Sequence, residues 1–228
     1  MNERKKEKKG EGIFKVLNLY ACLGGNRYKW DEVANVKVTA VEIDPELARL
    51  YMERFPNDKV IIGDAHEYLL NHYNEYDFVW TSTPCPTHSR ANYWGSKTVD
   101  ARNKYYPDMS LYQEIIFLDK WFKGLYCAEN VIPYYEPLIK AQKRGRHLYW
   151  CNFKLPATLS DRQVQIGAGE NEVKKLCEFH NFDFYKYGGG QRRDKIARNL
   201  VDYEAGKTIF KTAIEVLKQK DVLQTQLF

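Results

Sequence analysis

The stretch from Asp77 to Ser89 reads Asp-Phe-Val-Trp-Thr-Ser-Thr-Pro-Cys-Pro-Thr-His-Ser. Its first residues are largely apolar and β-favouring, and they predict a buried strand. Cys85 follows this strand between Pro84 and Pro86, which restrict the backbone on both sides and disfavour a helix. A cysteine that only packs would sit within the apolar run. Because α/β proteins bind their ligands at the carboxyl ends of strands, we expect Cys85 to take part in chemistry.

Apolar runs alternate with helical patterns on both sides of this stretch. The predicted strands are 16–20, 36–43, 60–62, 77–82, 125–128 and 147–153. The predicted helices are 45–55, 65–71 and 111–122, with one or two more helices over 194–219. Asp44 is the expected N-cap of the first helix, with Pro45 at its first position. Residues 86–108 indicate a long loop, and residues 154–190 show no strong periodicity. The alternation predicts an α/β fold, a doubly wound and mostly parallel sheet with helices on both faces.

Composition restricts the class of protein. With 228 residues and 44% hydrophobic content, the chain can bury one core without disulfides or metal. Its five cysteines form no C-x-x-C pair, and no Cys/His spacing suggests zinc, so we expect no metal and a reducing compartment. No apolar run approaches the roughly 20 residues of a membrane span, and the basic N-terminus does not resemble a secretory signal. We therefore expect a cytoplasmic protein without a membrane partner.

The excess of positive charge is small but clustered. The net charge is +5, and the clusters are at 4–9, 140–146 and 192–198. Such clusters suit a polyanionic partner such as nucleic acid, although solvated surface charge is the ordinary alternative. Residues 1–12, which are charged and almost without apolar side chains, are predicted to be a disordered basic tail.

Three predicted strand ends carry residues that suit an adenosine-containing ligand. Gly24 and Gly25 follow the first strand, where glycine allows a close approach of the backbone to the ligand. Glu42 ends the second strand and could accept both ribose hydroxyls. Asp64 follows the third strand and could accept from an adenine amino group. Their order along the chain matches the doubly wound fold, so together they predict an adenosine pocket. Glu129 follows the fifth strand, which would place a carboxyl opposite the Cys85 thiol.

With these motifs the sequence resembles the DNA cytosine-5 methyltransferase family. The resemblance spans roughly residues 14–215 and is carried by 18–25, 42–44, 63–64, 83–89, 128–131, 142–146 and 198–201. It implies a Rossmann-like S-adenosylmethionine-dependent methyltransferase fold. It also implies methyl transfer to C5 of cytosine in DNA through a covalent cysteine adduct, with S-adenosylhomocysteine as the product and with the target base flipped out or already single-stranded.

The resemblance also implies roles for individual residues. Cys85 would add to C6 of the base, Glu129 would hold or protonate N3, and Arg146 would orient the base. The implied cofactor residues are Tyr20, Gly24, Gly25, Glu42, Ile43, Asp64, Ala65, Pro84, Asn199 and Val201. The implied nucleic-acid residues are Ser89, Arg90, Asn92, Arg102, Arg144, Arg192, Arg193 and Lys195.

The sequence departs from the family pattern in several places. Asn18 replaces the usual acid, and Pro86 replaces the usual glutamine. The short interval between Val131 and Gln142 predicts that a helix and a strand are trimmed. We expect a catalytic core over 13–153, a reduced target-recognition segment over 154–190, and C-terminal helices over 191–228 that complete the core. Such a reduced member suggests a phage-like origin, with a second copy or a partner chain as a source of further recognition surface.

Three other functions stay open from the sequence. The first is an RNA cytosine-5 methyltransferase on the same fold. The second is a catalytically silent, cofactor-binding DNA regulator. The third, an NAD-type dehydrogenase, would share the glycine turn and Glu42 but would have no use for Cys85 together with Glu129.

Overall fold

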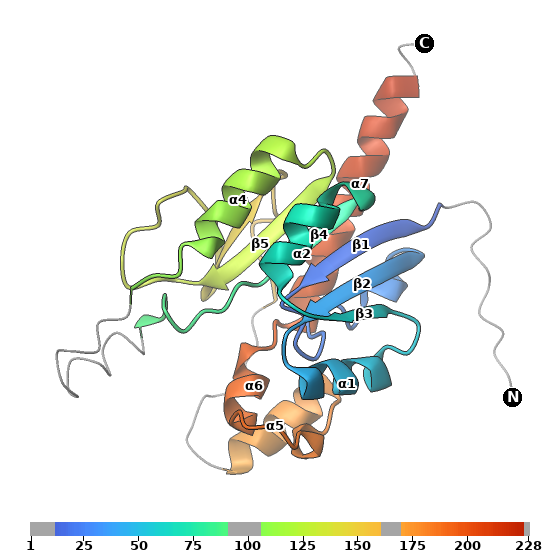
Figure 1. Cartoon of the computed structure of the whole chain (residues 1–228). Helices are drawn as coiled ribbons and strands as arrows, with labels where there is room; N and C mark the ends of the chain where they lie inside the picture. The colour runs from blue at the N-terminus through green and yellow to red at the C-terminus, as the bar shows by residue number, and fades with distance from the viewer. Residues whose placement is uncertain (1–11, 91–105, 161–169, 226–228) are drawn as a thin grey trace, which may run out of the picture.

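The computed structural model describes residues 12–90, 106–160 and 170–225 (Figure 1). Their centre is a seven-stranded sheet with the order β3-β2-β1-β4-β5-β7-β6. The strands are β1 (Phe14–Leu19), β2 (Val36–Glu42), β3 (Lys59–Ile62), β4 (Phe78–Thr81), β5 (Leu125–Val131), β6 (Gln142–Arg144) and β7 (His147–Cys151). Strands β1 to β5 are parallel, whereas β7 is antiparallel to both β5 and β6. The predicted α/β class with a mostly parallel sheet is therefore confirmed.

Helices cover both faces of the sheet. They are η1 (Trp30–Glu32), α1 (Pro45–Arg54), α2 (Ala65–His72), η2 (Tyr73–Glu75), α4 (Ser110–Trp121), α5 (Glu170–His180), η3 (Phe184–Lys186), α6 (Arg193–Asn199) and α7 (Tyr203–Thr225). Apolar residues of α7 and η1 pack on one face, around Trp30 and Trp80, and those of α2 and α4 pack on the other. Figure 1 shows α2 and α4 on the opposite side of the sheet from α7.

The sequence predicted most of these elements, and the first helix shows why. Asp44 Oδ1 accepts from the backbone N–H groups of Glu46 (2.9 Å) and Leu47 (3.3 Å), and Pro45 begins the helix. A side-chain cap and a proline at the first position define a helix start before any tertiary contact forms.

Two elements were not predicted from the sequence. Residues 154–190 contain the helix α5, whose buried residues Val173 and Leu176 pack in one cluster with Leu47 and Leu50 of α1. The sequence also did not indicate the three-residue β6, which forms a hairpin with β7. Other expectations agree with the structure: no helix or strand lies in the described interval between Val131 and Gln142, and the C-terminal region predicted as one or two helices forms α6 and α7.

Two structural features are absent from the part of the chain that the structure describes. In ranges 12–90, 106–160 and 170–225, no helix combines the length and the apolar content that a membrane crossing requires. The same ranges contain no group of three or more His, Cys, Asp or Glu side chains arranged to hold a metal ion.

Candidate active site

The ends of β4 and β5 lie side by side. Thr81 pairs in register with Ala128, so the chain leaving β4 runs next to Glu129 and Asn130. The Asn130 amide donates to both the backbone oxygen (3.0 Å) and the hydroxyl (3.1 Å) of Thr83. Its oxygen accepts from the backbone N–H of Val131 (2.8 Å). Asn130 is buried, so these bonds fix the Thr83–Cys85 segment against the end of β5.

Cys85 lies within electrostatic reach of a carboxylate and an ammonium group. Burial raises the pKa of the Cys85 thiol to about 11, with a further increase from the charge of Glu129. The charge of Lys195, on α6, acts in the opposite direction. The thiol is therefore protonated at neutral pH in the free protein. It becomes a thiolate more readily when the charge of Glu129 is neutralised.

Glu129 has a neighbour that the sequence reasoning missed. Its side chain is almost buried, and its Oε1 lies 3.6 Å from Nε2 of His147. On β5 and β7, Glu129 pairs with Tyr149 and Val131 pairs with His147, so Glu129 and His147 are diagonal neighbours on one face. Strand alternation is the signal that could have found His147. Arg146, the predicted base-orienting residue, is exposed in the turn between β6 and β7, one position before His147.

The loop after β1 is bent so that it closely approaches the C-terminal part of the chain. Tyr20, Cys22 and Gly24 have positive φ angles of 53°, 47° and 65°. A Cβ atom at Gly25 would lie only 2.6 Å from the backbone oxygen of Val201. The segment leading from α6 to α7 is therefore held against the glycine turn, so the fold brings Gly25 and Val201 together. Asn199 ends α6 and is exposed.

Glu42 lies at the end of β2, close to this turn. Its Oε2 accepts from the backbone N–H of Cys22 (2.7 Å), and its Oε1 accepts from that of Asp44 (2.9 Å). Burial raises the pKa of the Glu42 carboxyl, although these two backbone hydrogen bonds oppose the increase. The carboxylate is thus fixed in place and retains lone pairs for hydroxyl donors.

The neighbouring strand ends supply further features of an adenosine pocket. Ile43 is apolar yet 67% exposed beside Glu42, which gives a flat base a surface to pack on. Asp64 is exposed after β3, and its Oδ1 accepts from Glu67 N–H (2.8 Å) at the start of α2. Ala65 is buried, and Pro84 is exposed next to Cys85. A fixed acid, an exposed apolar side chain and a second acid at successive strand ends fit an adenosine-containing cofactor.

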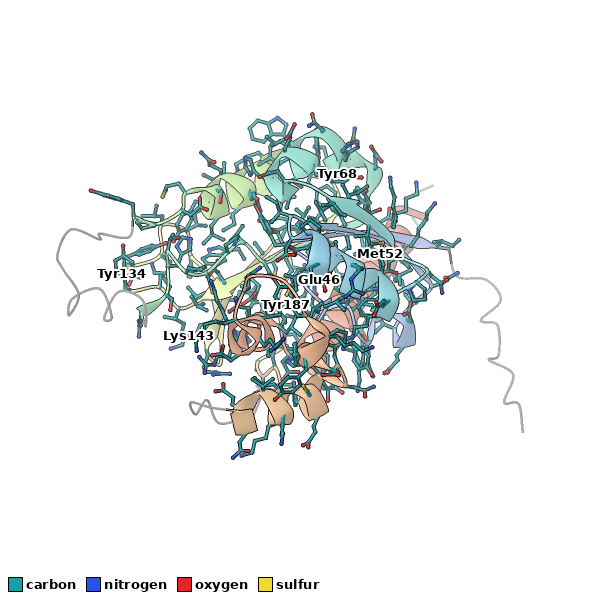
Figure 2. All side chains as sticks on the ribbon, turned by 60° about the horizontal axis from the view of Figure 1, so that its bottom comes forward. Glu46, Met52, Tyr68, Tyr134, Lys143 and Tyr187 are labelled. Atoms are coloured by element: carbon teal, nitrogen blue, oxygen red, sulfur yellow. The ribbon has the colours of Figure 1, made fainter. Side chains whose placement is uncertain are left out.

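Residues 187–191 fold over the turn between β2 and α1, which the sequence did not indicate. Asp44 Oδ2 accepts from the Tyr187 hydroxyl (2.8 Å) and from the Gln191 amide (3.0 Å). Burial alone would raise the pKa of Asp44, but the hydrogen bonds from Gln191 and Tyr187 hold it below its ordinary value. Figure 2 shows Tyr187 near Glu46 of α1. The segment that follows α5 and η3 thus borders the corner that contains Glu42.

The predicted nucleic-acid residues have different surroundings. Arg144 donates from its guanidinium to the backbone oxygens of Leu155 and Pro156, so it stabilises the edge at β6, and we leave it out of the proposed nucleic-acid surface. Ser89 bridges to Pro133, and Arg90 donates to the same residue's oxygen (3.0 Å). The exposed cationic residues of α6 and its N-cap are Arg192, Arg193 and Lys195. Asn92 and Arg102 lie outside the described residues.

The chain is similar to one known protein family and to several solved structures. The family model for C-5 cytosine-specific DNA methylases matches residues 14–116. Comparison with curated protein sequences found no significant match.

Among solved structures, the methyltransferase EhMeth of Entamoeba histolytica is similar at a TM-score of 0.51 and 9% identity, covering 92% of this chain and 99% of that one. A SAM-dependent methyltransferase from Agrobacterium tumefaciens (TM-score 0.40, 14% identity) covers 56% of this chain and 41% of its own. The putative methyltransferase yhhF from Escherichia coli (TM-score 0.39, 13% identity) covers 60% and 74%. The likeness to EhMeth shows the Rossmann-like methyltransferase fold. Residues 14–116 of the chain are similar to the C-5 cytosine-specific DNA methylase family, the family that the sequence motifs indicated.

Proposed function

We propose that this protein transfers a methyl group from S-adenosylmethionine to C5 of cytosine in DNA, with Cys85 as the covalent nucleophile. One observation carries the proposal. Cys85 and Glu129 interact across the ends of two adjacent parallel strands, and the hydrogen bonds from Asn130 to Thr83 fix that arrangement. Glu42 ends β2, which lies two strands away from β4 in the sheet. Because these strands are parallel, Glu42 lies on the same side of the sheet as Cys85, where the strands have their carboxyl ends.

The chemistry explains why a thiol is needed. C5 of cytosine is a poor nucleophile. Addition of the Cys85 thiolate to C6 forms a C–S bond and moves the C5=C6 electron pair toward C5, which then attacks an electrophilic methyl group. Loss of the C5 proton and departure of the thiolate restore the double bond. S-adenosylmethionine, when bound, supplies that methyl group on a positively charged sulfur.

The roles of Glu129 and Cys85 are coupled through charge. Proton transfer from Glu129 to N3 of the base, or a hydrogen bond between them, stabilises the negative charge that develops on the ring. The carboxylate of Glu129 raises the pKa of Cys85. The proton that leaves the Cys85 thiol passes to the Glu129 carboxylate and from there to N3 of the base, so the thiolate forms when the base is in place. Lys195 favours the thiolate throughout.

The other predicted residues have supporting roles in this proposal. Glu42, Ile43 and Asp64 would hold the ribose and the adenine of the cofactor, beside the turn at Gly24 and Gly25. Arg146 would orient the base from the hairpin turn. Arg90, Arg192, Arg193 and Lys195 would contact phosphates of a strand whose target base is flipped out or unpaired.

Transfer of label from S-[methyl-³H]adenosylmethionine tests the function. We expect label in duplex or single-stranded DNA, none in RNA of the same sequence, and a loss of about a thousandfold or more in Cys85→Ser. Label in RNA alone would assign the RNA alternative. Binding of cofactor and DNA without transfer to either nucleic acid would favour a silent regulator and contradict the proposal.

A further inference from the structure

The structure contains a buried carboxylate that the proposed chemistry does not use, and its hydrogen-bond partners lie in the loops beside the proposed cofactor site. Glu114, on α4, has no exposure to solvent. Its Oε1 accepts from the Tyr20 hydroxyl (2.6 Å), and its Oε2 accepts from the Thr81 hydroxyl (2.7 Å). Nδ1 of His66 lies 3.2 Å from Oε1. An ionised carboxylate without water is costly unless it is hydrogen-bonded and paired with a cation, and His66 can supply both.

The three partners of Glu114 come from three different strand ends. Tyr20 follows β1 with a positive φ angle of 53°, which places it in a backbone region that most side chains avoid. His66 is the second residue of α2, two positions after Asp64. Thr81 ends β4, three positions before Pro84. One carboxylate therefore connects the loops that would contact the adenosine part of the cofactor.

We propose that Glu114 is a positioning residue of the cofactor pocket, and that protonation of His66 strengthens cofactor binding by completing the ion pair. This inference rests on the proposed function for the identity of the ligand. Tyr20, Asp64 and Ala65 would touch the cofactor, whereas Glu114 acts through Tyr20, His66 and Thr81.

The groups around His66 determine the direction of the pH effect. The hydrogen bond with Glu114 raises the pKa of His66 although burial opposes it, and the negative charges of Glu114, Asp64 and Asp108 raise it further. Tyr20, which also faces Glu114, keeps its proton because burial and the Glu114 charge raise its pKa strongly. The ion pair is thus complete below the raised pKa of His66 and is lost as the pH rises through that value.

Calorimetry with S-adenosylhomocysteine, the unreactive product, tests this between pH 5.5 and 8.0. For the wild type we expect binding to weaken by about three- to tenfold over this range, because the bond involves charge but His66 is partly exposed. Glu114→Gln and His66→Gln should both bind more weakly at pH 5.5 and should lack that decrease. His72→Gln is the matched control, since His72 lies at the other end of α2 and pairs with Glu75 (2.7 Å); it should behave as wild type.

Proton NMR titration of the His66 imidazole gives a second measurement, made on the ion pair itself. We expect its pKa above the ordinary histidine value in the wild type and lower in Glu114→Gln. His66→Gln changes a partly exposed side chain, so the test survives if Glu114→Gln folds poorly. Equal pH profiles for wild type and His66→Gln would overturn the inference alone. A wild type that binds no S-adenosylhomocysteine at any pH would overturn the proposed cofactor as well.

Discussion

Cys85 is protonated at rest because it is buried close to a carboxylate. A pKa of about 11 leaves about one thousandth of the thiol ionised at pH 8. That low fraction protects the free protein from oxidation and alkylation, since the thiolate is the reactive form. Under the proposed mechanism, the thiolate forms when substrate binding changes the charge of Glu129.

Alkylation of Cys85 tests this electrostatic arrangement without any substrate. Glu129→Gln removes a negative charge, so it should lower the pKa of Cys85 and make the reaction with iodoacetamide at pH 8 severalfold faster. Lys195→Gln should raise the pKa and slow the reaction. Mass spectrometry of the peptide that contains Cys85 measures both rates.

Lys186→Gln serves as the control for these variants, because Lys186 is an exposed lysine on η3 that pairs with Glu53. It should leave the rate unchanged. Slower alkylation in Glu129→Gln than in the wild type would show that Glu129 does not raise the pKa of Cys85.

The sequence predicted where some of these side chains lie but not others. Cys85 and Glu129 could be predicted because each directly follows an apolar run, and parallel strands place their carboxyl ends together. His147 and Glu114 could not be assigned in this way. Glu114 lies inside a helical pattern, where its burial depends on the packing of α4 against β1 and β4. Periodicity does not show which polar position of a helix will face other loops.

At the scale of elements, the glycine turn after β1 is in close contact with the segment before α7. This contact fixes the backbone of the turn beside the proposed cofactor site. Gly25→Ala would place a Cβ atom 2.6 Å from Val201 O and 3.0 Å from Leu200 Cβ. We expect a loss of about 1–3 kcal/mol in the free energy of unfolding, because the backbone there must shift. Urea denaturation measures it.

Gly63→Ala is the matched substitution for that experiment. Gly63 also follows a strand, but the nearest atom to its added Cβ would be Ile61 Cγ2 at 4.0 Å. Its change in stability should stay within about 0.5–1 kcal/mol. Equal losses in the two variants would mean that the contact between Gly25 and Val201 does not constrain the turn.

The two elements that the sequence analysis missed differ in their origin. Helix α5 has apolar residues at helical spacing, Val173, Leu176 and Cys177, so its signal was available in residues 154–190. The three-residue β6 is too short for a periodicity of its own and exists because β7 pairs with it. The break between α6 and α7 follows from the approach of residues 200–201 to Gly25.

At the scale of the whole molecule, the positive charges at α6 indicate where nucleic acid would bind. Helix α5 packs against α1 through buried residues, which places residues 170–180 on the methyltransferase core. We therefore expect affinity to depend mainly on phosphate contacts from the cations at α6.

Arg192→Ala with Arg193→Ala should reduce DNA affinity by about tenfold for every sequence tested and should reduce the salt slope by about 1–2. Lys37→Ala with Lys59→Ala is the control, because these exposed lysines lie near the start of β2 and of β3, at the opposite edge of the sheet. Fluorescence anisotropy at several salt concentrations measures both. A loss confined to one sequence, or an equal loss in the control, would argue against phosphate contacts at α6.

Covalent trapping tests the central claim most directly. DNA that contains 5-fluorocytosine blocks the loss of the C5 substituent, so an enzyme that adds a cysteine to C6 stays attached after methyl transfer. With S-adenosylmethionine present, we predict a denaturation-resistant complex of the wild type whose cross-linked peptide contains Cys85, and none with Cys85→Ser. A wild type that methylates ordinary DNA but forms no adduct, or an adduct that persists in Cys85→Ser, would contradict the account.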